Sequence, residues 1–191
     1  MALFPTTTVR LRDGRVATIR HGVALDAPGL FALNKAVVAE DAYKLFTREE
    51  VDDVYKNLDR DLAKAEASPD RLQLVAVIGG EVVGELSVDG GKRERVRHIG
   101  KLGVALRADA RGVGLGAAML RSAIAWASAH PCIEKLSLCV HATNARAVAL
   151  YRKMGFEVEG TRRGELRYGP GRYVDDHVMA MWVKPRGAGV N

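Results

Sequence analysis

Two hydrophobic patterns alternate along the chain and predict both strands and helices. Short runs in which apolar and polar residues alternate are typical of strands. These runs cover residues 71–78, 81–89, 96–106, 135–141, 156–167 and 172–183. Residues 10–19 add two shorter extended runs on either side of Asp13-Gly14, a dipeptide that favours a hairpin turn.

Apolar residues at helical spacing predict helices over residues 27–40, 48–67, 115–129 and 145–154. The second of these helices carries an apolar stripe made of Val51, Val54, Leu58, Leu62 and Ala65. The elements run as strands, a helix, a strand, a helix and two strands. This order predicts a mixed α/β sheet with helices on both faces, in a single domain over residues 1–191.

Composition narrows the class of protein. Of 191 residues, 48% are hydrophobic and 27% are charged, which is typical of a globular chain with a core. No apolar run approaches the roughly 20 residues that span a bilayer, and no signal peptide is evident. Cys132 and Cys139 stand seven positions apart in a strand-like stretch and would point to opposite faces, so we expect free thiols in a reducing cytosol. We therefore expect a cytoplasmic protein that does not enter a membrane.

The net charge of +6 does not by itself identify a partner. The cations are spread along the chain, and the densest group, residues 92–97, lies between two strand patterns as expected for a solvated hairpin loop. A basic surface also suits an anionic cofactor. No Cys/His cluster has the spacing of a zinc site. We expect no nucleic-acid partner and no metal.

Three glycines alternate in the stretch Arg111-Gly112-Val113-Gly114-Leu115-Gly116-Ala117. The pattern also fits a dinucleotide fingerprint, but that motif follows the first strand of its unit and needs an acidic residue at the end of the next strand, where this chain has His141. A nucleoside-triphosphate loop needs a lysine that is missing here. A small-residue helix packed on a sheet is a third reading. The pattern favours an anion cradle, in which loop amides and a helix N-terminus hold a diphosphate that a Cβ would keep away.

A second motif follows at a suitable distance, since residues 144–156 read N-x-x-A-x-x-L-Y-x-x-x-G-F. Together the two motifs resemble the GNAT superfamily of acetyl-CoA-dependent acyltransferases, over about residues 15–183. The resemblance implies a GNAT-type mixed central sheet of about seven strands, with helices on both faces and a splayed pair of parallel strands, 96–106 and 135–141. The opening hairpin and the end of the chain resemble a bacterial branch that acetylates small amines, amino acids or protein N-termini.

The resemblance implies that acetyl-CoA is the co-substrate and lies between the two splayed strands. Backbone amides around Val104–Leu106 would bind the pantetheine arm and polarise the thioester carbonyl, and amides of the glycine loop would hold the pyrophosphate. The expected cofactor-binding residues are Val104, Ala105, Leu106, Arg111, Gly112, Val113, Gly114, Gly116, Ala117 and Asn144. Asn144 fits a helix cap equally well.

Acetyl transfer to an amine requires that the ammonium lose a proton and that the departing thiolate be stabilised. The resemblance implies that Tyr151 is the proton donor, whereas its spacing alone would also fit a core aromatic residue. Many relatives carry a carboxylate base on the strand before the glycine loop, where this chain has Lys101. His98 and Glu85 are the alternative bases, and a water relay without a dedicated base is a further alternative.

The acceptor amine is expected where the first two helices meet the last hairpin. The candidate substrate-binding residues are Glu40, Asp41, Tyr168, Tyr173 and Asp175. The acids would attract an ammonium, and Arg172 or His177 would hold the carboxylate of an amino acid. We expect an N-acetyltransferase for a small primary amine, foremost an amino acid. Protein N-termini or polyamines are alternative acceptors, a non-catalytic acyl-CoA sensor is an alternative of another class, and a homodimer fits the family.

Overall fold

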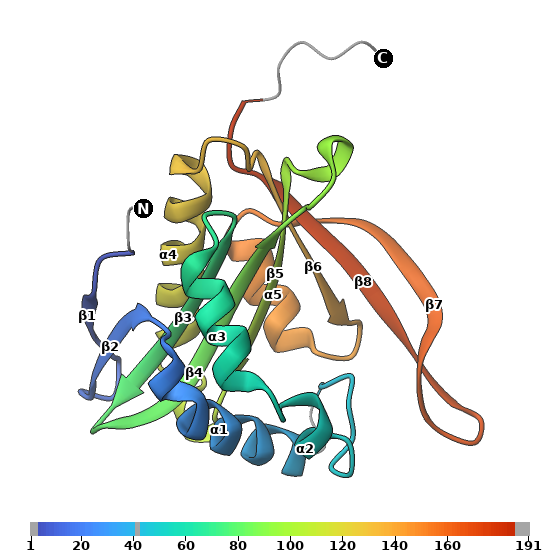
Figure 1. Ribbon diagram of the computed structural model, residues 1–191. Helices are drawn as coiled ribbons and strands as arrows, with labels where there is room; N and C mark the ends of the chain where they lie inside the picture. The colour runs from blue at the N-terminus through green and yellow to red at the C-terminus, as the bar shows by residue number, and fades with distance from the viewer. Residues whose placement is uncertain (1–3, 41–42, 186–191) are drawn as a thin grey trace. The chain divides into compact units, whose positions relative to one another are not determined.

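The computed structural model describes residues 4–40 and 43–185. In these residues eight strands form a sheet in the order β1-β2-β3-β4-β5-β6-β8-β7 (Figure 1). The strands are β1 (Thr7–Arg10), β2 (Val16–His21), β3 (Arg71–Ile78), β4 (Glu81–Gly90), β5 (Ile99–Leu106), β6 (Lys135–His141), β7 (Glu157–Gly169) and β8 (Arg172–Trp182). The α-helices are α1 (Ala27–Ala39), α2 (Val51–Val54), α3 (Leu58–Ala67), α4 (Leu115–Ala129) and α5 (Ala145–Lys153). The predicted mixed α/β class is confirmed, with eight strands in place of about seven.

The chain divides into two compact units. The first unit comprises residues up to Asp89 together with Val104–Ala123, and the second comprises Gly90–Gly103 together with the residues from Ile124 onward. Strand β5 and helix α4 therefore each contribute residues to both units.

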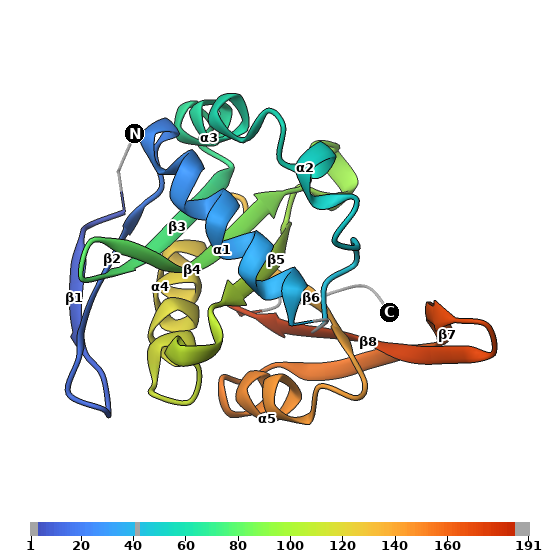
Figure 2. The ribbon, with the colours of Figure 1, turned by 90° about the horizontal axis from the view of Figure 1, so that it is seen from below.

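In the first unit, helices cover both faces of β3 and β4. Leu30 and Leu33 of α1 and Leu62 of α3 pack with Val75 of β3 in one apolar cluster. On the other face, a Cβ at Gly84 would come within 3.2 Å of the Met119 sulfur of α4. Glycine at this position thus lets α4 pack closely on the sheet, and Figure 2 shows α3 and α4 on opposite sides of β3 and β4.

A β-bulge in the β3–β4 pair decides which way a central acidic side chain points. Ala76 pairs with Gly84, but the next residue, Val77, pairs with Val82, so one extra residue is inserted into β4. Val75, which belongs to the α1 cluster, pairs with Glu85. Since paired residues point to the same face, Glu85 points toward α1 and away from the α4 side of Gly84.

The predicted helix over residues 48–67 is wrong as a single element, because it is divided into α2 and α3. Tyr55 leaves the helical conformation with a φ of −105° and a ψ of 8°. The Tyr55 ring packs edge-on against Phe46 at 5.5 Å between centroids. Asn57 directly precedes α3, and asparagine is unfavourable inside helices because its side chain hydrogen-bonds to nearby backbone groups. Val54, expected in the apolar stripe, is 50% exposed.

The second unit is built around β6, which has different neighbours on its two sides. It pairs in parallel with β5 from Ile99–Lys101 to Lys135–Ser137, and in antiparallel with β8 along its full length. Strand β5 continues past the end of the parallel ladder, as a splayed pair requires. Figures 1 and 2 show the β7–β8 hairpin projecting beyond β6 and α5. Cys132 and Cys139 are free thiols, as expected.

Candidate functional site

The glycine loop of the first unit has the backbone that an anion cradle needs. Gly112 and Gly114 have φ angles of 79° and 98°, in the left-handed region that side-chain-bearing residues rarely adopt. The Gly114 carbonyl accepts a hydrogen bond from the Ala118 amide at 3.1 Å and so begins α4. A Cβ at Gly114 would meet no atom within 4 Å. The loop therefore leaves open space beside a helix N-terminus whose amides attract anions, and its residues fit a diphosphate.

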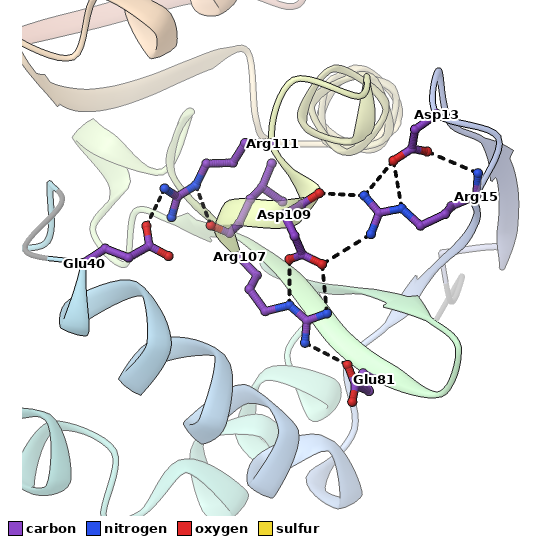
Figure 3. A network of polar contacts seen from close by, with 8 residues as sticks. Asp13, Arg15, Glu40, Glu81, Arg107, Asp109 and Arg111 are labelled. Atoms are coloured by element: carbon purple, nitrogen blue, oxygen red, sulfur yellow. Dashed lines mark hydrogen bonds and ion pairs between the residues drawn. The ribbon is translucent and has the colours of Figure 1, made fainter.

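Arg111, expected to help bind the pyrophosphate, is engaged within the protein. Its Nε donates to the Leu106 carbonyl at 2.8 Å, and its Nη1 lies 2.5 Å from Glu40 Oε2 (Figure 3). Glu40 is the residue that caps the C-terminus of α1, and it was itself a candidate for binding the acceptor. The structure thus brings these two candidates together as an ion pair, while their roles toward ligands stay predictions.

A network of charged side chains holds the turn that leads into the glycine loop. Arg107 binds Asp109 at 2.8 Å and Glu81 at 2.8 Å, and Arg15 donates to the Asp109 carbonyl at 2.6 Å (Figure 3). Asp13 binds Arg15 from the β1–β2 turn at 2.7 Å. The hydrogen bond from Arg107 lowers the pKa of the Asp109 carboxyl, which stays ionised. Sequence reasoning missed this network, because its members come from three separate hairpins and turns.

The backbone segment Val104–Leu106, expected to bind pantetheine, lies next to Glu85. The Arg107 amide donates to the Val83 carbonyl at 2.9 Å. Strands β4 and β5 run antiparallel, so a step of two residues back from Arg107 matches a step of two residues forward from Val83. This register places Glu85 opposite Ala105. Neighbouring strands lie about 5 Å apart. Glu85 is therefore the candidate base that this unit places beside the expected thioester segment.

Glu85 forms a polar cluster with residues that the sequence did not single out. Its Oε1 lies 3.3 Å from Lys44 Nζ, and Lys44 Nζ also donates to Asn34 Oδ1 at 2.7 Å. Asn34 is fully buried on α1. Burial, together with the nearby Glu85 charge, raises the pKa of the Tyr55 hydroxyl. A buried asparagine inside a helix was the one sequence signal that could have indicated this cluster.

Tyr151, the candidate acid, lies in the second unit on α5. Its side chain is 7% exposed, and its ring packs on Phe156 with centroids 5.9 Å apart. Burial raises the pKa of Tyr151 to about 12, so the hydroxyl keeps its proton at neutral pH. No other described residue forms a hydrogen bond with that hydroxyl. Asn144 caps the same helix, because its Oδ1 accepts from the Ala147 amide at 3.1 Å.

His98, the other candidate base, makes contacts typical of a structural residue. Its ring stacks on Trp182 at 6.3 Å with an interplanar angle of 18°. Its backbone carbonyl accepts from the amides of Glu134 and Lys135, which precede and begin β6. Lys101, at the position where a carboxylate was expected, is exposed on β5. The contacts of His98 thus hold the first residues of β6 next to the start of β5.

The candidate acceptor residues of the second unit have different surroundings. Tyr168 shares a hydrogen bond of 2.8 Å with Nδ1 of His141, a buried histidine whose pKa is lowered by burial. Asp175 Oδ1 accepts from the Gly164 amide at 2.8 Å. Tyr173 is 59% exposed. Asp41 lies outside the described residues. The structure thus joins Tyr168 to a histidine that sequence reasoning had not selected.

Within residues 4–40 and 43–185, no three His, Cys, Asp or Glu side chains gather closely enough to hold a metal ion. Every helix in the same residues is too short or too polar to cross a membrane.

Known proteins resemble this chain in sequence. Residues 38–156 match the model of the acetyltransferase (GNAT) family. An L-amino acid N-acetyltransferase of Escherichia coli is 37% identical over 109 residues, which are 56% of this chain and 66% of that protein. The match thus spans just under two thirds of the relative's length.

Solved structures resemble it in fold. A GNAT-family acetyltransferase of Streptococcus pneumoniae superposes with a TM-score of 0.82 at 28% identity, over 88% of this chain and 99% of that one. A putative acetyltransferase of Salmonella typhimurium, solved with acetyl-CoA, superposes with a TM-score of 0.77 at 20% identity, over 91% of this chain and 98% of that one. The family match covers the glycine loop and the whole of the second motif, and the fold agrees along nearly the whole chain. The chain therefore belongs to the GNAT acetyltransferase family.

Proposed function

We propose that this protein transfers the acetyl group of acetyl-CoA to the α-amino group of a free amino acid. The observation that carries the proposal is the loop at residues 111–117, where Gly112 and Gly114 are left-handed and an added Cβ at Gly114 would meet open space beside the start of α4. Backbone amides of this loop would hold the diphosphate of acetyl-CoA. The name of the Escherichia coli relative, an L-amino acid N-acetyltransferase, supports the amino acid as acceptor.

Glu85 is the base in this proposal. The acceptor arrives mainly as an ammonium, because free amines have pKa values near ~10. Its proton passes to the Glu85 carboxylate, and the nitrogen lone pair then forms a bond to the thioester carbonyl carbon. Glu85 suits this step because it lies opposite Ala105, beside the segment whose amides would polarise that carbonyl. The position of Lys101 offers no carboxylate for the same role.

Tyr151 supplies the second proton. The carbon–sulfur bond breaks as the amide forms, and the thiolate takes the hydroxyl proton of Tyr151. The amide nitrogen releases its second proton to solvent water, and water returns a proton to the Tyr151 phenolate. A tyrosine is already protonated at neutral pH, and burial raises the pKa of Tyr151 further, to about 12. When bound, acetyl-CoA would contribute an activated acyl group, and the protein's own residues would position it and move the two protons.

The test is a panel of acceptors with purified protein and acetyl-CoA, read by thiol release and by the mass of the product. The panel holds the free amino acids, simple amines, polyamines and short peptides with free N-termini. We expect acetylation of one or more free amino acids at the α-nitrogen. Acetylation of spermidine or of N-terminal peptides alone would overturn the choice of acceptor. Tight binding of acetyl-CoA without turnover on any member would instead favour a sensor.

A further inference from the structure

The cluster around Lys44 has the chemistry to recognise the carboxylate of the acceptor. We propose that Lys44 binds the α-carboxylate of the amino acid while Glu85 binds its α-ammonium. This inference rests on the proposed function and makes Lys44 the residue that distinguishes amino acids from plain amines.

The contact between Lys44 and Glu85 is one that a ligand can open. Their Nζ–Oε1 distance is 3.3 Å, whereas charge-assisted hydrogen bonds usually measure about 2.7–2.9 Å. The two side chains are 19% and 16% exposed, so water screens their attraction only partly while both stay in contact with solvent. The ion pair is therefore loose but electrostatically active.

Both partners have hydrogen-bonding capacity to spare. An ammonium has three donors and a carboxylate has two acceptor oxygens. Among the described residues, Lys44 Nζ donates to Asn34 and Glu85 only, and Glu85 Oε2 has no partner. An α-amino acid brings a negative and a positive group on one carbon. Its carboxylate can accept a hydrogen bond from the third N–H of Lys44 while its ammonium binds Glu85, so neither charge is left unpaired.

The surrounding structure holds the Lys44 side chain in place. The fully buried Asn34 donates from Nδ2 to the Leu30 carbonyl at 2.9 Å, which turns its Oδ1 toward Lys44. The Phe46 ring lies 5.3 Å from Nζ and adds a cation–π contact. Tyr43, next to Lys44, has a φ of +59°, a strained conformation for a residue with a side chain. Such strain persists where the local structure is over-determined, as around a binding group.

The placement of the cluster matches the reaction. Because the β-bulge turns Glu85 toward α1, it meets Lys44 there, and the register with β5 keeps Glu85 opposite Ala105. An amino acid held by Lys44 and Glu85 would thus present its nitrogen to the side chain that removes the proton. Lys44 acts here as a substrate-binding residue and leaves the proton transfers to others.

The experiment compares Lys44→Met and Lys44→Gln with the wild type on matched acceptors. For the best amino acid of the panel, kcat/KM is measured beside its decarboxylated amine. We expect the wild type to prefer the amino acid, and each variant to lose that preference by about 10- to 100-fold. The loss should arise from a higher KM for the amino acid, with activity on the amine little changed.

The matched control is Lys35→Met, which removes a lysine that also pairs with a carboxylate, Asp52 at 3.0 Å, and lies over a ring, Phe31 at 4.8 Å. It should keep the wild-type preference. Equal losses on amino acid and amine in both Lys44 variants would assign Lys44 a structural role and overturn the inference. If a folded Lys44 variant keeps the wild-type preference for the amino acid over the amine, the inference is overturned while the proposed function stands. A wild type that acetylates only carboxylate-free amines would overturn both.

Discussion

At the scale of single residues, Tyr151 combines an apolar environment with a group that can donate a proton. Its side chain is almost fully buried and its ring packs on Phe156. Burial disfavours the phenolate, which is why the pKa rises to about 12. The same residue thus contributes to packing and, in the proposed mechanism, holds a proton for the departing thiolate. Two measurements on one variant separate these contributions.

We expect Tyr151→Phe to lower turnover by roughly 10²-fold or more, in the range of a general acid. The ring and its contact with Phe156 are kept, so acetyl-CoA affinity should change little. Turnover is measured at saturating substrates, under conditions in which chemistry limits the rate, and affinity by titration calorimetry. Wild-type turnover in this variant would leave Tyr151 as a packing residue.

We also expect Tyr151→Phe to change how the free energy of unfolding depends on pH in the alkaline range. The folded-state pKa of Tyr151 is raised from 10.0 to about 12, so the unfolded chain loses this proton first as the pH rises. The stabilisation that Tyr151 contributes through this shift is fully present below pH 10 and is lost as the pH rises toward 12. The loss reaches up to about 2–3 kcal/mol of unfolding free energy. Urea unfolding at pH 9 and pH 11.5 should therefore show a smaller fall for Tyr151→Phe than for the wild type. An equal fall in both proteins would contradict the shift.

At the scale of elements, the turn between β5 and α4 is held in place by charged side chains and shaped by glycines. Arg107, Asp109 and Arg15 hold the turn before the loop, and Arg111 ties the loop itself to Glu40. Since these side chains are partly exposed, each pair contributes little to stability by itself. Together these contacts hold the loop and the turn before it in one geometry.

We expect Gly114→Val to weaken acetyl-CoA binding by more than tenfold, because the branched side chain would fill the open space where the diphosphate would lie. Strain alone would also disturb the loop, since φ at Gly114 is 98°. The control is Gly80→Val, at a turn where φ is 87° and where an added Cβ likewise meets nothing within 4 Å. Titration calorimetry should show weakened binding only for Gly114→Val. Unchanged affinity in a folded Gly114→Val protein would remove the loop from the binding site.

At the scale of the whole molecule, the net charge of +6 favours the approach of polyanionic ligands in general. In the proposed function, specific binding comes from the loop at residues 111–117, where amides and open space occur together. Any ligand that binds the folded state alone raises the free energy of unfolding in proportion to the logarithm of its concentration. Thermal unfolding therefore reports binding without a catalytic assay.

We expect acetyl-CoA at 100 times its dissociation constant to stabilise the protein by about 2.7 kcal/mol, which raises Tm by roughly 5–10 °C for a chain of this size. S-acetylpantetheine at the same concentration lacks the diphosphate and should raise Tm far less. Differential scanning calorimetry gives both values. Equal shifts would show that the diphosphate contributes nothing to binding, against the role assigned to residues 111–117.

The features that the sequence determined by itself are those governed by contacts between near neighbours. Three features depend on local backbone preferences and short-range hydrogen bonds: the left-handed glycines before α4, the Asn144 cap and the turn at Asp13-Gly14. The spacing of apolar residues indicated most strands and the class of the sheet. It failed at residues 55–57, where the ring contact of Tyr55 with Phe46 accompanies a break in the expected helix.

Only the tertiary structure decided which polar side chains meet. Arg111 and Glu40 are 71 residues apart in the sequence, and Lys44 and Glu85 are 41 apart, so no local pattern relates them. The orientation of Glu85 depends on one extra residue in β4, because strand side chains alternate between faces and an insertion reverses that alternation. The spacing of residues along the chain could name Glu85 as a candidate, but the packing of α1 on the bulged sheet was needed to place it beside Lys44.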